Sequence, residues 1–140
     1  ENYNIFFLVF IICISTDVGG YVFGNIFKGP KLTKISPKKT YAGMIGGYLL
    51  SIIFAKVFFE YLSENMEVGF TPQFFIIVIL ISSISQLGDI VISYFKRQSK
   101  VKDTGKIIPG HGGLLDRIDG MIFAFPFSYL IFATNIISIN

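Results

Sequence analysis

Residues 43–62 read GMIGGYLLSIIFAKVFFEYL, an apolar stretch with a single charge before its last three positions. A helix rises 1.5 Å per residue, so these 20 residues would extend about 30 Å, the thickness of the hydrocarbon core of a bilayer. Lys56 and Glu60 are spaced i, i+4 near one end, where they can pair or reach toward the interface. The stretch therefore predicts a transmembrane helix.

Further apolar stretches lie on both sides of it. Residues 74–95 are apolar through Ile84 and then carry polar side chains, and residues 120–139 are uncharged. Residues 5–14 are too short to cross a bilayer alone. They continue past Asp17 and Gly19 to Phe27 as an interrupted helix, or the chain begins partway through this span. The predicted fold is all-α, a polytopic transmembrane bundle of about four spans with interrupted helices and cytoplasmic site loops.

The composition supports a membrane protein. Of the 140 residues 52% are hydrophobic and only 15% are charged, whereas soluble domains carry about 25% charged residues. This excludes a disordered chain and a small soluble domain, and the single Cys13 excludes an internal disulfide framework. A nucleic-acid partner is not expected either, because the basic residues lie between the spans and not on one face of a soluble domain.

The charges divide the connecting segments into two kinds. Residues 28–40 hold five Lys and no acid, and residues 96–119 hold six basic residues, whereas residues 63–71 hold Glu64 and Glu67 and no base. Alternating spans place both basic segments on one side of the membrane, and the positive-inside rule makes that side cytoplasmic. The predicted location is an integral membrane protein, of the inner membrane if the source is bacterial, with its site facing the cytoplasm.

Polar side chains gather around the second basic segment. A solvated loop would also carry charges, but Asp89 lies inside the end of a predicted membrane helix, where a carboxylate is costly without a partner or a function. Asp116 and Asp119 share one face of a helix start, just after a glycine-rich turn at residues 109–113. Backbone amides in such a turn favour anions.

Carboxylates beside clustered cations suit a phosphate ligand held with Mg²⁺. Mg²⁺ takes one or two protein carboxylates and leaves its other positions to water and phosphate oxygens, while Lys and Arg bind phosphate oxygens directly. The residues thus predict transfer at a phosphate. In the first basic segment, Lys38 and Lys39 fit either a phosphate contact or simple attraction to anionic lipid. Asp17 ends an apolar run nearby.

The segment from Ser93 to Asp119 resembles the signature of the phosphatidate cytidylyltransferase (CDP-diacylglycerol synthase) family. The matching positions are Ser93, Lys96, Arg97, Lys102, Asp103, Gly105, Pro109, His111, Gly112, Gly113, Asp116, Arg117 and Asp119. Residues 17–47 also resemble the family, best at Ser36-Pro37-Lys38-Lys39-Thr40. The chain departs from the family pattern at Asn25, where an Arg is frequent, and at Tyr41-Ala42, where Trp-Glu is common.

The resemblance implies the reaction of CTP with phosphatidate to give CDP-diacylglycerol and pyrophosphate. It implies a Mg²⁺ site held by Asp89 and Asp116, with K⁺ as an accompanying monovalent cation of the family. The catalytic residues are then expected to be Asp89, Asp116, Lys102, Asp103, His111, Arg117 and Asp119. The substrate-binding residues are expected to be Ser36, Lys38, Lys39, Thr40, Ser93, Lys96, Arg97, Gly112 and Gly113.

Complete chains of that family are about twice as long. Residues 1–140 are therefore expected to be the carboxyl-terminal portion of one integral-membrane catalytic domain, which lacks amino-terminal spans. The expected partners are CTP, phosphatidate and membrane lipid, with a possible homodimer. Three alternatives remain at this point. One is a CTP-dependent kinase of polyprenol or phytol, which would release CDP, and another is a piece of a transporter or channel, since intramembrane carboxylates also mark ion paths. The third is an inactive, purely structural homologue, which the loss of a signature Asp would indicate, and none is lost here.

Overall fold

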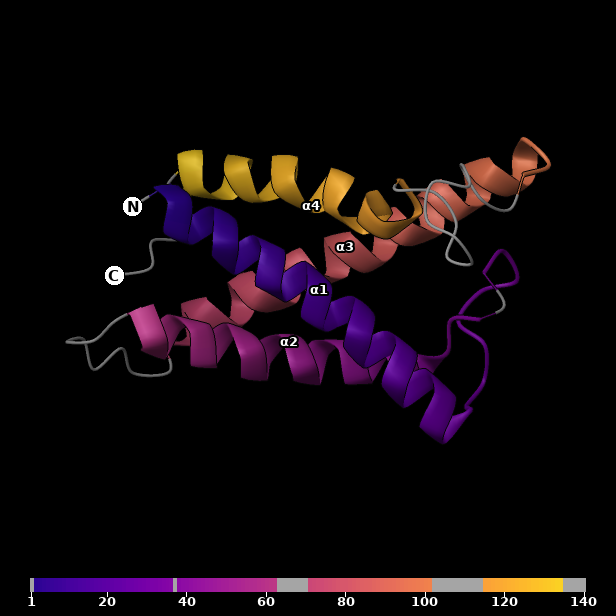
Figure 1. Ribbon diagram of the computed structural model, residues 1–140, viewed down its shortest axis with the longest axis horizontal. Coiled ribbons are helices and arrows are strands. Elements are labelled where there is room, and N and C mark those ends of the chain that lie inside the picture. Colours follow the sequence, from indigo (N-terminus) through magenta and orange to yellow (C-terminus); the bar gives the residue numbers. More distant parts are fainter. Residues whose placement is uncertain (1, 37, 63–70, 102–114, 135–140) are drawn as a thin grey trace.

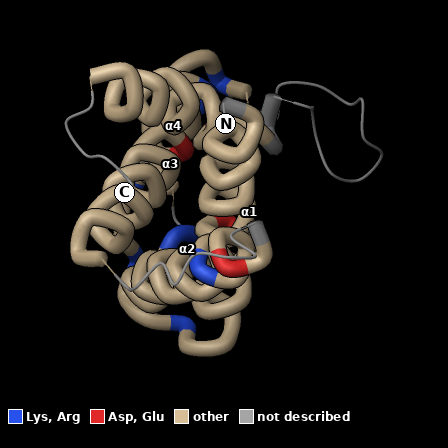
Figure 2. The backbone as a smooth tube through the Cα atoms, turned by 90° about the vertical axis from the view of Figure 1, so that its left-hand side faces the viewer, with Lys and Arg blue, Asp and Glu red and all other residues tan. Residues whose placement is uncertain are grey.

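Four helices account for most of the described chain. The computed structural model describes residues 2–36, 38–62, 71–101 and 115–134. The helices are α1 (Asn2–Phe27), α2 (Tyr41–Leu62), α3 (Pro72–Gln98) and α4 (Leu115–Ala133). They run lengthwise through the molecule (Figure 1), and an end-on view shows that most of their length is uncharged (Figure 2). The all-α prediction is confirmed.

Three of these helices are long and apolar enough to cross a membrane, namely α1, α2 and α3. The chain is thus an integral membrane protein with the spans predicted around residues 43–62 and 74–95. The fourth predicted span, residues 120–139, is helical as far as Ala133, and its apolar part, Ile118–Ala133, is shorter than the other three. Residues 135–139 lie outside the described part of the chain.

The interruption that the sequence suggested in the first span is not present. Helix α1 runs unbroken through Asp17 and the two glycines that follow it. These glycines serve close packing: a Cβ atom on Gly19 would lie 2.5 Å from the carbonyl oxygen of Gly46, and one on Gly43 would lie 2.6 Å from that of Gly20. Small residues permit such backbone contact between membrane helices. The most extensive helix contact in the bundle joins α1 to α2.

Helix α3 contacts each of the other three helices, α1, α2 and α4. Its hydroxyl groups form hydrogen bonds across the interfaces with α1 and α2. The Thr16 and Ser82 hydroxyl oxygens lie 2.8 Å apart, as do those of Tyr48 and Ser83. The buried apolar core is built from all four helices and consists of Leu8, Val9, Ile12, Cys13, Ala55, Phe74, Ile77, Val78, Ile81, Met121 and Ala124.

The described residues of the segment between α1 and α2 form a loop with backbone hydrogen bonds of its own. Lys28 adopts a left-handed backbone with φ of 41° directly after α1, and Gly29-Pro30 prevents the helix from continuing. Lys31 and Thr40 then form an isolated antiparallel bridge. Both this loop and the end of α3 lie at the same end of the molecule (Figure 1). The first basic segment and the described start of the second, at Lys96 and Arg97, therefore lie at one end of the bundle, as their positions between the spans predicted.

The glycine contact between α1 and α2 can be tested by stability. Gly19→Ala should destabilise the protein by about 1–3 kcal/mol, because the new methyl group would overlap backbone atoms of α2. Gly20→Ala is the matched control, since a Cβ atom there would meet Gly43 O at an ordinary 3.7 Å. The measurement is unfolding in detergent micelles. Equal stability of the two variants would contradict the backbone contact.

Candidate active site

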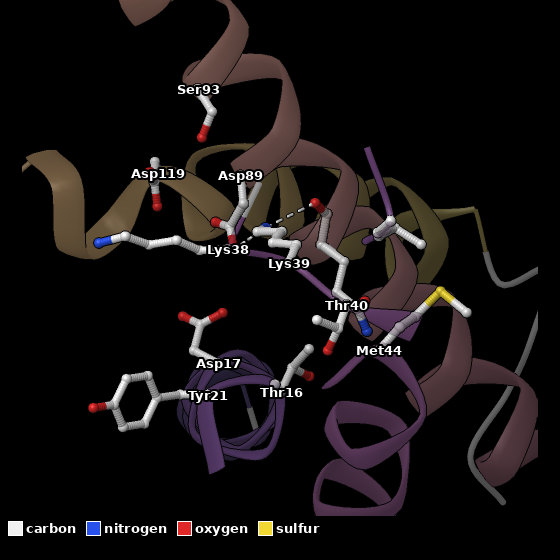
Figure 3. Close-up of a pocket in the computed structure, with 13 residues that line it drawn as sticks. Thr16, Asp17, Tyr21, Lys38, Lys39, Thr40, Met44, Asp89, Ser93 and Asp119 are labelled. Carbon is white, nitrogen blue, oxygen red and sulfur yellow. Dashed lines mark hydrogen bonds and ion pairs between the residues drawn. The ribbon is translucent and has the colours of Figure 1, made fainter. Parts of the chain in front are cut away.

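A cavity of about 340 Å³ opens at the end of the bundle where the two basic segments lie. It is lined by residues of all four helices and of the loop between α1 and α2, and Figure 3 shows Asp17, Lys39, Asp89 and Asp119 around a common space. The lining residues are Thr16, Asp17, Gly20, Tyr21, Leu32, Lys38, Lys39, Thr40, Met44, Gln86, Asp89, Ser93 and Asp119. We call this cavity the active pocket.

The loop places two lysines in the active pocket through its own hydrogen bonds. The Leu32 amide donates to Lys39 O at 2.7 Å, and the Lys39 amide donates to Ser36 O at 3.0 Å. Thr40 follows directly and caps α2, because its hydroxyl oxygen accepts the Gly43 amide at 3.1 Å. The backbone that carries Lys38 and Lys39 is therefore held between the bridge and the start of α2.

Lys39 is paired with Asp89 of α3. Its Nζ atom lies 2.8 Å from Asp89 Oδ2 and 3.5 Å from the carbonyl oxygen of Gln86. Both charged side chains are largely buried, with 28% and 16% of their surface exposed. Ion pairs that are removed from water in this way interact more strongly than surface pairs. The pair connects the loop between α1 and α2 to α3, the helix that carries Asp89 (Figure 3).

A second ion pair joins α3 to α4. Lys96 Nζ lies 3.5 Å from Asp119 Oδ2, and these side chains are only 15% and 14% exposed. The Gly120 amide donates to Asp119 Oδ1 at 3.1 Å. The close approach of α4 requires this glycine, since a Cβ atom on Gly120 would lie 2.6 Å from Asp89 Oδ1. The Asp89 and Asp119 carboxylates are thus brought together at the contact between α3 and α4.

The carboxylates of the active pocket fit a hard cation such as Mg²⁺. Asp17, Asp89 and Asp119 come from three different helices and line the same cavity. Asp89 Oδ1 is buried and has no hydrogen-bond partner among the residues described. Within that same part of the chain, His, Cys, Asp and Glu side chains form no group of three or more placed to hold a metal. Mg²⁺ needs only one or two carboxylates when phosphate and water complete its shell.

The structure brings together several residues that the sequence singled out. Asp89, Asp119, Lys38, Lys39, Thr40 and Ser93 line the active pocket, and Lys96 joins them through Asp119. Two predicted substrate-binding residues lie elsewhere: Ser36 is part of a loop turn, where its amide donates to Thr33 Oγ1, and Arg97 lines a different cavity.

The remaining predicted residues fall on segments that are not described. Lys102, Asp103, His111, Gly112 and Gly113 lie outside the described residues. Asp116 and Arg117 belong to the first turn of α4, but the positions of their side chains are also outside the description. Their proposed roles in catalysis and metal binding stay predictions.

Asp17 is the main addition that the structure makes to the site. The sequence marked it as a carboxylate beside an apolar run but assigned it no role. Its cost inside a membrane helix was the available signal, yet only the packing of α1 shows that it shares a cavity with Asp89 and Asp119. Thr16, Tyr21, Met44 and Gln86 also line this cavity and carried no distinctive pattern in the sequence.

The comparison with known families agrees with this site. Residues 1–135 match the model of the cytidylyltransferase family. The chain belongs to that family. Among its relatives, a protein of Haemophilus influenzae is 44% identical over 128 residues, which cover 89% of this chain and 44% of the relative. One of Staphylococcus saprophyticus is 40% identical over 127 residues, which cover 90% of this chain and 48% of the relative. Both carry the name phosphatidate cytidylyltransferase.

The family resemblance that the signature implied is therefore confirmed. The chain spans about half the length of the curated relatives that it matches.

The buried ion pair of this cytidylyltransferase family member can be measured with a double-mutant cycle. Lys39→Gln and Asp89→Asn should each destabilise the protein, and the double variant should recover part of the loss, because neither charge is then left buried alone. The expected coupling is about 0.5–3 kcal/mol in detergent unfolding experiments. The exposed pair of Lys56 and Glu60, 3.4 Å apart, is the control, with about 0.3–0.5 kcal/mol expected. Additive effects at Lys39 and Asp89 would contradict the pairing.

Proposed function

We propose that the protein, as a whole chain, transfers the cytidylyl group of CTP to phosphatidate and so forms CDP-diacylglycerol and pyrophosphate. The observation that carries this proposal is one cavity in which lysines and three carboxylates meet at the end of a membrane bundle. The name that the relatives carry supports the same reaction. A lipid phosphate can reach such a cavity from the bilayer surface, and a nucleotide can reach it from water.

The reaction needs no nucleophilic side chain. An oxygen of the phosphatidate phosphate attacks the α-phosphorus of CTP and forms the new P–O–P bond. The bond between the α-phosphorus and the oxygen that bridges to the β-phosphate breaks, and pyrophosphate leaves with that electron pair. The attacking group is already an anion, so the protein has to position two phosphates that repel each other and to neutralise their charge.

Three lysines are suited to that task. Lys38 and Lys39 are neighbours in the loop and both line the active pocket, and Lys96 pairs with Asp119, which also lines it. An ammonium group binds a phosphate oxygen as a compact point charge. Lys39 would exchange part of its contact with Asp89 for the incoming phosphate. This leaves Asp89 Oδ2 ready for another cation.

Asp89 and Asp119 are the described residues that would hold Mg²⁺, with Asp116 as the further ligand that the signature implies. The unpartnered Asp89 Oδ1 atom and the nearby Asp119 carboxylate supply the oxygen donors. When bound, Mg²⁺ would neutralise negative charge on the phosphate oxygens. The protein residues would fix its position relative to Lys38 and Lys39.

The reaction can be tested with the complete protein in membranes, using phosphatidate, Mg²⁺ and CTP labelled in the cytosine ring. Label should enter chloroform-extractable lipid, and Asp89→Asn should reduce the rate by about 10²–10³-fold, the usual cost of removing a group that organises transition-state charge. Glu60→Gln, at the opposite end of α2, is the control and should retain full activity. Asp116→Asn should also abolish turnover while leaving membrane insertion intact.

The same assay distinguishes the kinase alternative. A polyprenol or phytol kinase would release CDP and leave the lipid without cytosine label. Absence of lipid label from well-inserted wild-type protein would contradict the proposed reaction. Label that forms equally well with excess EDTA would instead contradict the proposed Mg²⁺ dependence.

The orientation toward the cytoplasm is part of the same proposal and follows from the positive-inside rule. Ser99 caps the end of α3 that carries Asp89 and Ser93, and Tyr61 lies at the end of α2 away from Thr40. In intact cells, an impermeant thiol reagent should label Tyr61→Cys and should leave Ser99→Cys unlabelled until the cells are opened. The buried Cys13 should stay unreactive in both. The reverse pattern would overturn the orientation.

A further inference from the structure

A second cationic cavity lies beside the active pocket but does not share its lining. It is an open groove on the surface, with a volume of about 670 Å³, and its lining residues Lys34, Ile35, Tyr94, Arg97 and Gln98 are all exposed. Lys34 and Ile35 come from the loop between α1 and α2, and the other three from the last turns of α3. We call it the interface pocket.

Helical geometry explains why Lys96 and Arg97, which are neighbours in the sequence, point toward different pockets. Successive residues of a helix point about 100° apart, so Lys96 and Arg97 cannot face the same way. Lys96 pairs with Asp119, and Ser93, one turn before it, lines the active pocket. Tyr94 and Arg97 are also spaced i, i+3, and they share the face that lines the interface pocket.

The chemistry of the interface pocket is that of an anion site. Arg97 offers a planar guanidinium, Lys34 an ammonium and Tyr94 a phenol hydroxyl, all of which donate hydrogen bonds. No Asp or Glu side chain lines the cavity among the residues described. The carboxyl end of α3 contributes about half a negative charge, which two full positive charges outweigh.

The position of the pocket suits a ligand at the membrane surface. The 27 residues of α3 extend about 40 Å at 1.5 Å per residue, longer than the hydrocarbon core of about 30 Å. Its last turn carries Lys96 and Arg97, and charged side chains place that turn at the membrane surface and not in the hydrocarbon core. Tyr94 and Ile35 add apolar surface to the lining, and Tyr is typical of the membrane–water interface.

We propose that the interface pocket is a second phosphate-binding site, separate from the active pocket, in which Arg97 and Lys34 hold the phosphate group of a phosphomonoester. That group belongs either to a lipid headgroup or to a free phosphate. The site binds this ligand without taking part in bond breaking. The proposal concerns binding alone and does not require the cytidylyl transfer.

The test is calorimetric titration of the complete protein in phosphatidylcholine nanodiscs. The probes are a short-chain phosphatidate and inorganic phosphate, with short-chain phosphatidylcholine as the negative control. The titrations use a Lys38→Gln background, which removes a cation from the active pocket and leaves the pair of Lys39 and Asp89, and with it the position of the loop, unchanged. Because no CTP is present, failure of the proposed reaction would not affect the result.

We expect at least one phosphate probe to bind this background. Arg97→Gln and Lys34→Gln should each weaken that binding about fivefold, as expected for one cation near the membrane surface. Lys31→Gln is the matched control, because it removes the same charge from the same loop but does not line the pocket. Thermal unfolding would verify that each variant is folded.

The two probes distinguish the source of the phosphate. Binding of short-chain phosphatidate but not of inorganic phosphate would support a lipid headgroup site, and equal binding of both would support a site for a free phosphate group. Absence of binding by either probe would overturn the proposal. An equal loss in Arg97→Gln and Lys31→Gln would also overturn it, since it would indicate general charge attraction.

Discussion

The ion pair between Lys39 and Asp89 is the interaction on which the arrangement of the site depends. A carboxylate in a membrane helix is costly unless it is paired or used, and Lys39 meets that requirement from a loop 50 positions earlier in the sequence, with its Nζ 2.8 Å from Asp89 Oδ2. The pair closes one wall of the active pocket. It also holds the loop against α3, so both the active pocket and the interface pocket inherit their shape from it.

Two kinds of packing support this ion pair from either side. The glycines of α1 and α2 let the two backbones touch, and this contact brings Asp17 close to the capped start of α2. On the other side, Gly120 allows α4 to approach α3 so closely that Asp119 lies beside Asp89. The carboxylates thus converge because small residues let the helices that carry them approach closely, while hydroxyl hydrogen bonds and ion pairs join the same helices.

Much of this architecture was predictable from the sequence, and the reasons are physical. Hydrophobic length predicts the spans, and the alternation of basic and acidic segments predicts that Lys39 and Lys96 lie at the same end. The cost of charge in the membrane singles out Asp89. The sequence does not show whether Gly19 permits close contact between two helices or interrupts the helix that contains it, because glycine is favoured in both situations. The sequence also does not show that Lys96 and Arg97 belong to different sites, because the interface pocket forms only where the loop with Lys34 packs against α3.

The contact between α1 and α2 has a consequence for biogenesis. These helices adjoin in the chain, are joined by the 13 residues 28–40, and make the most extensive contact in the bundle. Their hairpin can therefore associate during synthesis, before α3 and α4 have entered the bilayer. Lys39 would then already lie at the membrane surface when α3 inserts, because it is synthesised before Asp89. The cation is therefore in place before the carboxylate that it neutralises. With this order of insertion, the Asp89 carboxylate of α3 has a cation to pair with as soon as it enters the membrane.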